Sequence, residues 1–365
     1  MKIKEVLSHL EQKFPLSYQE DFDNCGIQCG DKEREITGVL VCFEMSDATI
    51  DEAIALNANL VISHHPLILR KGIMKVEPTH RVGRIICKAL EHKMVLYSMH
   101  TNLDSAPGGV NDLFAAKLGL HDVEVLSPAD GNLRKIAFFV PESHCEKVQE
   151  ALFAVGCGRL GNYEQCAYRV HGEGGFLPNE AANPFIGTAG KRETVEEERV
   201  EMVFPAHLQH TVIQTLYANH PYEEPAFDIY RLENPSRTVG LGRVGNLAEA
   251  VEGEAFLRHV KDIFGVEAVK YYGNLSKPVR RVAVCGGGGS SFISDAMAAK
   301  ADIYISGDIK YHDFHTADGR MIIADIGHLE SEQFVKEIIY NELKENFSNF
   351  AVSFAEVEKM KIGII

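Results

Sequence analysis

Short apolar runs alternate with amphipathic segments along the first third of the chain. Gly38–Cys42 and Leu60–Ser63 are apolar, whereas Ser46–Asn57 between them has its apolar residues at helical spacing. The alternation continues with a helical pattern over Val82–His92 and an apolar run over Met94–Met99. Because buried parallel strands have continuous apolar runs and are joined by helices, this order predicts a mostly parallel sheet covered on both faces.

The last third of the chain repeats this order. Strands are predicted over Arg281–Cys285, Ile303–Ser306 and Met321–Ile326. A helix is predicted over Ser291–Lys300, and a second helix follows the third strand. This third is therefore also predicted to have an α/β fold.

The first and last thirds also share details of sequence. The six residues that end at Ser63 (Ala-Asn-Leu-Val-Ile-Ser) resemble the six that end at Ser306 (Ala-Asp-Ile-Tyr-Ile-Ser). A cysteine stands 21 residues before each serine, at Cys42 and Cys285. We therefore predict a duplicated α/β sandwich domain that both ends of the chain form together.

The middle third has a different order of elements. Two β-α-β units are predicted over Lys135–Val140, Cys145–Ala154, Tyr163–Val170, Arg199–Phe204, His207–Ala218 and Phe227–Arg231. This order predicts a ferredoxin-like α+β domain inserted into the α/β domain. The predicted division is 1–126 and 241–365 for the two parts of the α/β domain, with 127–240 as the insert.

The composition and net charge of the chain argue against some classes of binding partner. The 365-residue chain is 45% hydrophobic, enough for packed globular domains, and its formal net charge is −15. Such an acidic chain is a poor match for nucleic acid or an anionic membrane, whereas a small anionic substrate is compatible because a bound metal can invert the local field. No signal-peptide pattern and no apolar run of the roughly 20 residues that span a bilayer is present. With eight scattered cysteines, we expect reduced thiols and a cytoplasmic location.

Histidines and acids gather where the predicted strands end. They are His64, His65, His100, Asp104, His328 and Glu332. Open α/β sheets bind ligands at the carboxyl ends of their strands. With His100 left aside, three imidazoles and two carboxylates already exceed what one tetrahedral zinc ion requires, and they suit two ions that share a bridging carboxylate. The predicted ligands are His64, His65, Asp104, His328 and Glu332.

The donor set also restricts the metal. Mixed nitrogen and oxygen donors favour zinc, iron, manganese, cobalt or nickel over calcium, and we favour two zinc ions per subunit. His328 and Glu332 are four residues apart at the start of a predicted helix, so they would project from one face. A His-His dipeptide alone is weak evidence, but three separate groups at strand ends are hard to explain by packing.

Three segments together resemble the family of GTP cyclohydrolase I type 2 homologues. They are Ser63–Pro66 (Ser-His-His-Pro), His100–Asp104 (His-Thr-Asn-Leu-Asp) and Gly327–Glu332 (Gly-His-Leu-Glu-Ser-Glu). The resemblance covers nearly the whole chain, and the middle third is similar to the insert of longer family members. Such inserts resemble small trimeric regulatory proteins of the nitrogen-signalling and copper-tolerance type.

This resemblance implies a dinuclear metal centre in which the five predicted ligands hold the ions and Glu332 bridges them. It also implies a homohexameric ring with its metal sites facing an internal cavity. His100 is not among the family's ligands, so we expect it to line the site. The family name implies a small-molecule substrate, a purine nucleotide, whose imidazole ring is opened at C8 with release of formate.

The loop after the predicted strand Ile303–Ser306 carries candidate residues for proton transfer. Asp308 aligns with His65 in the proposed duplication, and His312 and His315 follow on the same loop. A metal pair can activate water for attack on an electrophilic carbon or phosphorus. Asp308, His312 and His315 are therefore the predicted catalytic acid–base residues.

Other interpretations stay open at this point. The same metals could serve a phosphoesterase or an amidohydrolase, or the hexamer could be a non-catalytic metal-binding regulator or scaffold. Gly286–Ser291 could bind a phosphate or form a tight strand-to-helix turn. Gly240–Gly245 matches the dinucleotide pattern G-x-G-x-x-G, and a structural turn is favoured there because a lone match is weak.

Overall fold

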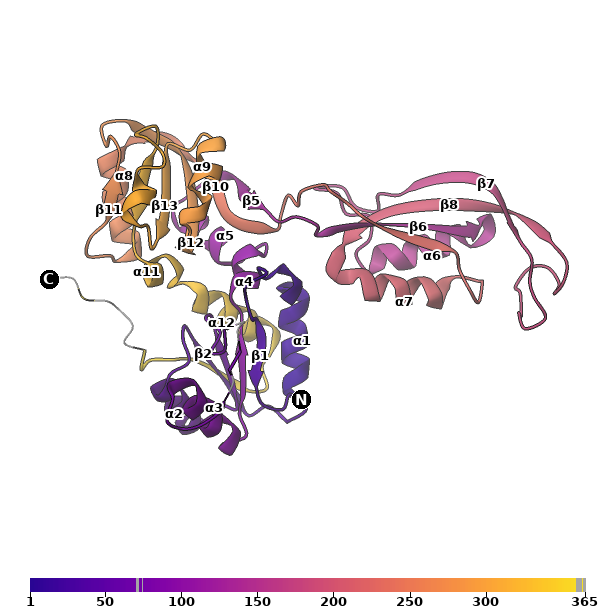
Figure 1. The fold of residues 1–365 in the computed structure, drawn as a ribbon, viewed down its shortest axis with the longest axis horizontal. Helices are drawn as coiled ribbons and strands as arrows, with labels where there is room; N and C mark the ends of the chain where they lie inside the picture. The colour runs from indigo at the N-terminus through magenta and orange to yellow at the C-terminus, as the bar shows by residue number, and fades with distance from the viewer. Residues whose placement is uncertain (70–71, 74, 359–362, 364–365) are drawn as a thin grey trace. The chain divides into compact units, whose positions relative to one another are not determined.

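The computed structural model describes residues 1–69, 72–73, 75–358 and 363, and it divides into two compact units (Figure 1). Unit 1 comprises Met1–Pro128 together with Thr238–Ile365, and unit 2 comprises Ala129–Arg237. Strands and helices alternate through much of unit 1, so the predicted mixed α/β class is confirmed. Within the described ranges, no helix has both the length and the apolar character that crossing a bilayer requires.

The first sheet of unit 1 has five strands. In spatial order they are β1 (Gly26–Cys29), β4 (Val95–Ser98), β3 (Leu60–Ser63), β2 (Gly38–Cys42) and β15 (Ala351–Phe354). Neighbours are parallel except at β1, which runs antiparallel to β4. Helices cover both faces: α1 (Ile3–Lys13) and α12 (Val335–Asn346) pack on one, and α2 (Asp47–Ala55) and α3 (Arg81–Glu91) pack on the other. This two-sided burial explains the unbroken apolar runs of the central strands.

The second sheet of unit 1 has six strands. In spatial order they are β11 (Lys270–Tyr272), β14 (Ile322–Asp325), β13 (Ile303–Gly307), β12 (Pro278–Gly288), β10 (Gly240–Glu252) and β5 (His121–Pro128). The strands β12, β13 and β14 are parallel, and the outer pairings are antiparallel. One face packs against α5 (Val110–Lys117) and α8 (Gly253–Phe264), and the other packs against α9 (Ile293–Ala298).

Parts of the two sheets have the same arrangement. In each, three parallel strands follow the same spatial order, β4-β3-β2 and β14-β13-β12, and an antiparallel strand flanks the first of them. Ser63 pairs with Ser98 in one sheet, and Ser306 pairs with Asp325 in the other. These correspondences support the proposed duplication, which stays a prediction.

Short helices follow several of the parallel strands. These are α4 (Thr101–Ser105) after β4, α10 (Tyr311–Phe314) after β13 and α11 (His328–Glu332) after β14. Three 3₁₀ turns in the described chain complete the connections: η1 (Leu16–Tyr18), η2 (Ala206–Leu208) and η3 (Ser290–Phe292). The side chains predicted to carry chemistry lie on these helices or on the loops beside them.

Unit 2 contains one antiparallel sheet with two helices on one face. The strands, in spatial order, are β7 (Tyr168–Phe176), β8 (Glu193–Pro205), β6 (Leu133–Pro141) and β9 (Phe227–Arg231). The helices α6 (Glu142–Ala154) and α7 (Gln209–Asn219) pack on the alternate side chains of β6 and β8 that form the core. The element order β6-α6-β7-β8-α7-β9 is that of ferredoxin-like domains, and assignment to that class stays a prediction.

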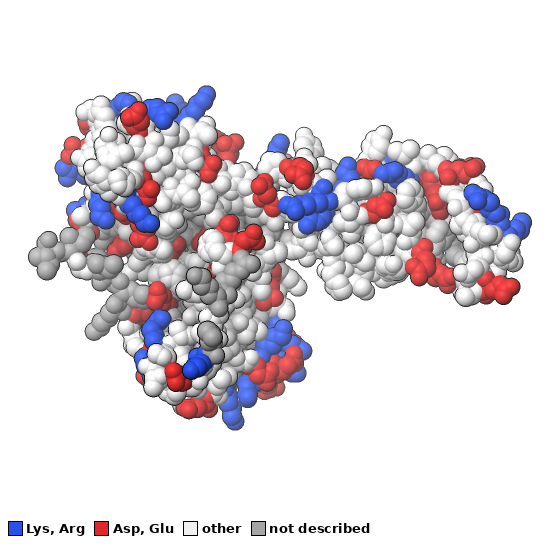
Figure 2. All heavy atoms as spheres, viewed as in Figure 1, with Lys and Arg blue, Asp and Glu red and all other residues white. Residues whose placement is uncertain are grey.

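Acidic and basic side chains are interspersed over the described part of the face shown in Figure 2. The chain has 52 acidic and 37 basic residues, and neither sign dominates a broad area of that face. Fields from interspersed charges cancel beyond a Debye length, about 8 Å at physiological ionic strength. Among its described residues, this face therefore has no broad charged surface that would attract a large charged partner.

Candidate metal centre

The predicted ligands lie beyond the carboxyl ends of parallel strands in both sheets of unit 1. His64 and His65 follow β3, and Asp104 lies on α4 after β4. His328 and Glu332 are the first and last residues of α11, after β14. The two sheets thus each contribute part of one cluster, and contacts between His65 and His328 join them directly.

The Glu332 carboxylate lies at the centre of this cluster. Its Oε2 atom is 3.5 Å from the Nε2 atom of His64, 3.5 Å from that of His65 and 3.2 Å from that of His328. The Glu332 side chain is only 3% exposed. Three imidazole nitrogens that converge on one buried carboxylate oxygen form an arrangement that suits a bridging ligand.

Each of these histidines is oriented through its other ring nitrogen. Nδ1 of His64 donates to the backbone carbonyl of Met99 at 2.9 Å. Nδ1 of His65 donates to Glu44 Oε1 at 3.1 Å, and Nδ1 of His328 donates to Asp308 Oδ2 at 2.7 Å. In the neutral imidazole these bonds favour a lone pair on Nε2, as in metal-ligating histidines whose second nitrogen bonds to a carbonyl or carboxylate.

Two groups of three donors share Glu332. One is His64, Asp104 and Glu332, which are all buried, and the other is His65, His328 and Glu332. Within each group the candidate ligand atoms lie within 4.8 Å of one another. In the first group, His64 Nε2, Asp104 Oδ1 and Glu332 Oε2 are buried without a hydrogen-bond partner among the described residues. Buried polar atoms are nearly always satisfied, so these three atoms fit a bound cation.

Electrostatics within the cluster favour positive charge on its imidazoles. Burial opposes charge on His65, but hydrogen bonds to neighbouring carboxylates raise its pKa to about 9. The Glu332 carboxylate, 3.2 Å away, raises the pKa of His328 to about 9. Burial raises the pKa of Asp104 to about 6. Burial also acts to raise the pKa of Glu332, but the surrounding imidazoles hold it well below its usual range. These shifts show that the cluster favours positive charge beside Glu332, and divalent cations would supply it in place of protons.

The glycine run Gly286–Gly289 packs directly against Glu332. A Cβ atom at Gly287, where φ is +66°, would lie 2.2 Å from Glu332 Oε1, so only glycine leaves room for the carboxylate. Asn111 connects this run to the first half of the site, because its Oδ1 accepts from the Gly286 amide at 2.9 Å and its Nδ2 donates to the Asp104 carbonyl at 3.0 Å. The run therefore helps to position both carboxylates.

The same run is poorly suited to bind a phosphate. The amides of Gly286, Gly287 and Gly289 donate to side-chain oxygens of the protein at 2.9, 2.9 and 3.0 Å. The 3₁₀ turn and short helix α9 that follow leave no long helix N-terminus for an anion. The structure favours the tight-turn interpretation of Gly286–Ser291. Gly240–Gly245 lies in β10, where Gly242 has a φ of +66° and a Cβ atom would lie 2.8 Å from the Val284 carbonyl.

Asp308 contacts a predicted ligand directly. Besides its bond to His328, it has a φ of +53°, an uncommon conformation that aspartate tolerates better than most residues. A Cβ atom at the preceding Gly307 would lie 2.8 Å from the backbone of Gly327 and His328. The second half of the unit thus has no room for a histidine where the first half has His64, and it supplies a carboxylate that orients His328.

His312 and His315 lie on and just after α10 and are exposed. The His315 ring is 4.7 Å from that of Tyr272 and 5.0 Å from that of Tyr311, and the His312 ring is 5.3 Å from that of Tyr311. Among the contacts of the described residues, none joins either histidine to the cluster around Glu332. Their catalytic role stays a prediction without a supporting contact.

His100 lies closer to the cluster than these two histidines. Its ring is 5.2 Å from that of His64 and 5.3 Å from that of His65, and it forms a further group of candidate donors with them. Nδ1 of His100 donates to Asp23 Oδ2 at 2.9 Å, which leaves Nε2 for other contacts. Burial opposes charge on Asp23, but the bonds from His100 and Thr101 hold its pKa well below its usual range.

Sequence reasoning missed Glu44 and Asp23, the two carboxylates that orient His65 and His100. Glu44 stands two residues after β2, at the same sheet edge as His64, and this position was a usable signal. Asp23 precedes β1, in a polar stretch with no comparable signal. Cys25 donates to Asp23 at 3.1 Å, and burial raises the pKa of its thiol to about 12, so it stays protonated and is a poor metal ligand.

Asp308→Asn is expected to weaken binding of the ion that His328 would hold by about tenfold, because the substitution removes the negative charge of the carboxylate that accepts from Nδ1 and leaves the ligand in place. Asparagine also tolerates the positive φ of this position. Competition titration of zinc against a chelator measures the change. Asp313→Asn, on the adjacent α10 and away from the ligands, is the control, and equal affinities for the two variants would contradict the orienting role.

Comparisons with known proteins cover most of the chain. Residues 1–361 match the model of the Duf34/NIF3 (NGG1p interacting factor 3) family. A protein of Halalkalibacterium halodurans named GTP cyclohydrolase 1 type 2 homolog is 40% identical over 343 residues, which are 93% of this chain and 91% of that protein. A Bacillus subtilis protein of the same name is 39% identical over 344 residues, 93% of this chain and 91% of that protein.

Solved structures show the same similarity. A crystal structure of a Bacillus cereus protein related to NIF3 is 35% identical, with a TM-score of 0.86, and the match covers 100% of this chain and 99% of that one. A Staphylococcus aureus protein is 28% identical, with a TM-score of 0.77 and the same coverage. The predicted resemblance to GTP cyclohydrolase I type 2 homologues is confirmed, and the chain belongs to the Duf34/NIF3 (NGG1p interacting factor 3) family.

Proposed function

We propose that unit 1 holds two divalent metal ions bridged by Glu332. His64 and Asp104 would complete the set of ligands for one ion, and His65 and His328 would complete the set for the other. The observation that carries this proposal is the convergence of three Nε2 atoms on Glu332 Oε2, at 3.2–3.5 Å, while each Nδ1 atom is bonded elsewhere.

The donors support a borderline transition metal. Imidazole with carboxylate suits zinc, iron, manganese, cobalt and nickel, and zinc is the favoured assignment because it accepts low coordination numbers with an open position. Calcium is disfavoured because it takes six to eight oxygen ligands. Each ion would have three protein donors, which leaves room for substrate or water.

The proposed activity is metal-dependent hydrolysis of a purine nucleotide. Bound metal ions would supply Lewis-acid polarisation and activation of water. The relatives from Halalkalibacterium halodurans and Bacillus subtilis are named GTP cyclohydrolase 1 type 2 homologs, which supports GTP as the first substrate to test. We extend the proposal to a homohexamer, which light scattering would test through a mass six times that of the chain.

His100 is the side chain best placed to move a proton in this site. Asp23 holds the proton on Nδ1, so Nε2 can accept a proton from water or donate one to a leaving group. The ring lies beside His64 and His65 and is 20% exposed, so it can reach both the cluster and solvent. Glu44 and Asp308 would hold the imidazoles of His65 and His328 in their orientations during the proton transfer.

His100→Gln is expected to lower turnover by about 10²–10⁴-fold while metal content is retained, because it removes a proton-transfer group without removing a proposed ligand. Metal analysis by mass spectrometry and turnover are measured on the same preparation. His92→Gln, at the exposed end of α3, is the matched control. Loss of metal together with activity would place His100 among the ligands instead.

The proposed activity is tested with metal-stripped full-length chain reloaded with zinc, manganese or iron(II). GTP and a panel of phosphoesters and amides are offered, and ring-opened product, formate and phosphate are measured. We expect two ions per chain and formate release from GTP that requires them. Two bound ions without metal-dependent turnover of GTP would overturn the substrate assignment, and no turnover on the whole panel would favour the regulatory or scaffold alternative.

A further inference from the structure

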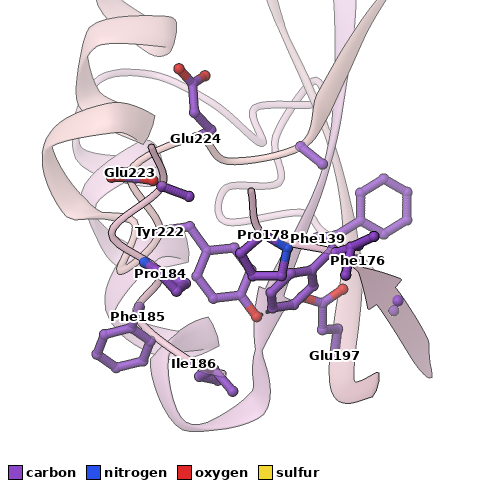
Figure 3. A pocket seen from close by; sticks show the side chains of 15 residues that line it. Phe139, Phe176, Pro178, Pro184, Phe185, Ile186, Glu197, Tyr222, Glu223 and Glu224 are labelled. Carbon is purple, nitrogen blue, oxygen red and sulfur yellow. Dashed lines mark hydrogen bonds between the residues drawn. The ribbon is translucent and has the colours of Figure 1, made fainter. Parts of the chain in front are cut away.

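A cavity of about 420 Å³ lies in unit 2, far along the chain from the predicted metal ligands (Figure 3). Phe139 on β6, Phe176 at the end of β7 and Glu197 on β8 line it together with Tyr222, from the loop after α7. Phe139 alternates with the core residues that α6 and α7 cover, so the cavity is on the opposite face of the sheet. Its volume is in the range of small-molecule sites.

Aromatic and proline side chains form most of its wall. The Phe176 ring is 6.0 Å from the Tyr222 ring, and the Phe185 ring is 6.4 Å from it. Pro178 and Pro184 also line the cavity (Figure 3). Ring faces attract cations, and rings set at angles to one another form the walls of known ammonium-binding cages.

Every charged residue of the lining is acidic. These residues are Glu197, Glu223 and Glu224, and no lysine or arginine is among the described lining residues. Arg199, which lies two residues from Glu197 on β8, pairs with Glu201 at 2.9 Å, and its guanidinium is 5.7 Å from the centre of the Phe139 ring. The charged side chains that line the cavity are therefore all negative.

Glu197 is the buried member of this set. It is 8% exposed, and its Oε1 atom accepts from the Tyr222 hydroxyl at 2.8 Å. Oε2 has no hydrogen-bond partner among the described residues. A Cβ atom at Gly174 would lie 2.0 Å from Oε2, so the glycine leaves room for this carboxylate. A buried carboxylate with one oxygen free is a site for a positive partner.

The chemistry of the lining excludes other ligand classes. An anion would meet three carboxylates and no lysine or arginine in the described lining, and a neutral apolar ligand would bury the free Glu197 oxygen without a partner. A metal ion needs convergent ligands, but among the described residues the groups of three or more potential ligands lie in unit 1. An organic cation would be attracted both by the carboxylates of the lining and by the faces of its aromatic rings.

We propose that this cavity binds a small organic ammonium ion with an apolar body, its nitrogen at Glu197 Oε2 and its body against Phe139, Phe176 and Tyr222. The site is separate from the metal centre and does not depend on whether unit 1 hydrolyses a nucleotide. The exposed Glu223 and Glu224 would attract the cation toward the mouth of the cavity.

The test uses three probes of one shape and different charge on the full chain. They are 2-phenylethylammonium, 2-phenylethanol and 3-phenylpropanoate, and ligand-observed NMR titrations give each Kd. We expect the ammonium ion to bind about tenfold or more tightly than the alcohol, because only the cation forms a charge-assisted bond to Glu197, and we expect the carboxylate not to bind.

Glu197→Gln locates the interaction. Glutamine keeps the size of the side chain and can still accept from Tyr222, so we expect the preference for the ammonium ion to fall to within about twofold of the alcohol. Glu150→Gln removes one charge from an exposed position on α6 and should leave the preference unchanged. Equal binding of ammonium and alcohol to the unaltered chain, or no binding of the ammonium ion at millimolar concentration, would overturn the proposal. An unchanged preference in Glu197→Gln would overturn it as well.

Discussion

Glu332→Gln is expected to remove both metal ions at once. The three imidazole Nε2 atoms lie 3.2–3.5 Å from Glu332 Oε2, so one side chain serves both groups of donors. Glutamine has the same size but no charge, and its amide nitrogen donates hydrogen bonds where glutamate has a second oxygen. We expect affinity for each ion to fall by about 100-fold or more, a larger effect than loss of an orienting residue produces. Chelator competition and metal analysis of the purified variant measure it.

Glu337→Gln is the matched control. Glu337 is on α12, five residues further along, and its 45% exposed side chain pairs with Lys117 at 3.3 Å. Its substitution removes the same charge and should leave two ions bound. If Glu332→Gln retained both ions, the shared-ligand arrangement would be wrong. If it lost one ion, Glu332 would belong to a single metal.

Arg243→Ala is expected to destabilise unit 1 by about 3 kcal/mol, because removal of the buried guanidinium leaves several acceptors without a donor. Nη2 of Arg243 donates to Asp112 at 3.0 Å, and the guanidinium also donates to the carbonyls of Gly240, Gly242 and Ala106 at 2.9, 2.8 and 3.3 Å. The side chain is 3% exposed. Alanine would leave these acceptors in a space that water enters poorly. Urea unfolding followed by circular dichroism measures the loss.

Arg258→Ala provides the comparison. Arg258 is 75% exposed and pairs with Glu254 one helical turn away, an arrangement that adds little to stability. Its removal should leave the urea midpoint unchanged within error. A similarly small effect of Arg243→Ala would show that the buried guanidinium contributes less to stability than its contacts indicate.

The central strands could be predicted closely from the sequence because their burial on both faces gives unbroken apolar runs. The strands β2 and β3 have the predicted bounds, Gly38–Cys42 and Leu60–Ser63, and β13 extends the predicted strand by one residue, to Gly307. The outer strands were missed because backbone pairing defines them. β5 is mostly exposed, and β10 contains the glycines that suggested a turn.

For the site, strand ends were a sufficient guide to which side chains gather, since parallel neighbours finish at one sheet edge. His64, His65, Asp104, His328 and Glu332 do lie together, and their binding of metal stays a prediction. The partners of their second ring nitrogens were harder to foresee. Whether Asp308 faces His328 or a substrate depends on a positive φ that its sequence neighbours do not reveal, and α10 is too short for its pattern to show where His312 points.

The order of the proposed ligands along the chain sets when the proposed metal centre could be completed. The whole of unit 2 lies between Asp104 and Glu332, a separation of 228 residues (332 − 104). At ribosomal rates of about 5–20 residues per second, translation of that stretch takes roughly 10–50 s. During that interval the nascent polypeptide exposes two histidines and an aspartate without the carboxylate they converge on. In the proposed two-metal arrangement, metal loading would therefore be completed only after Glu332 has left the ribosome.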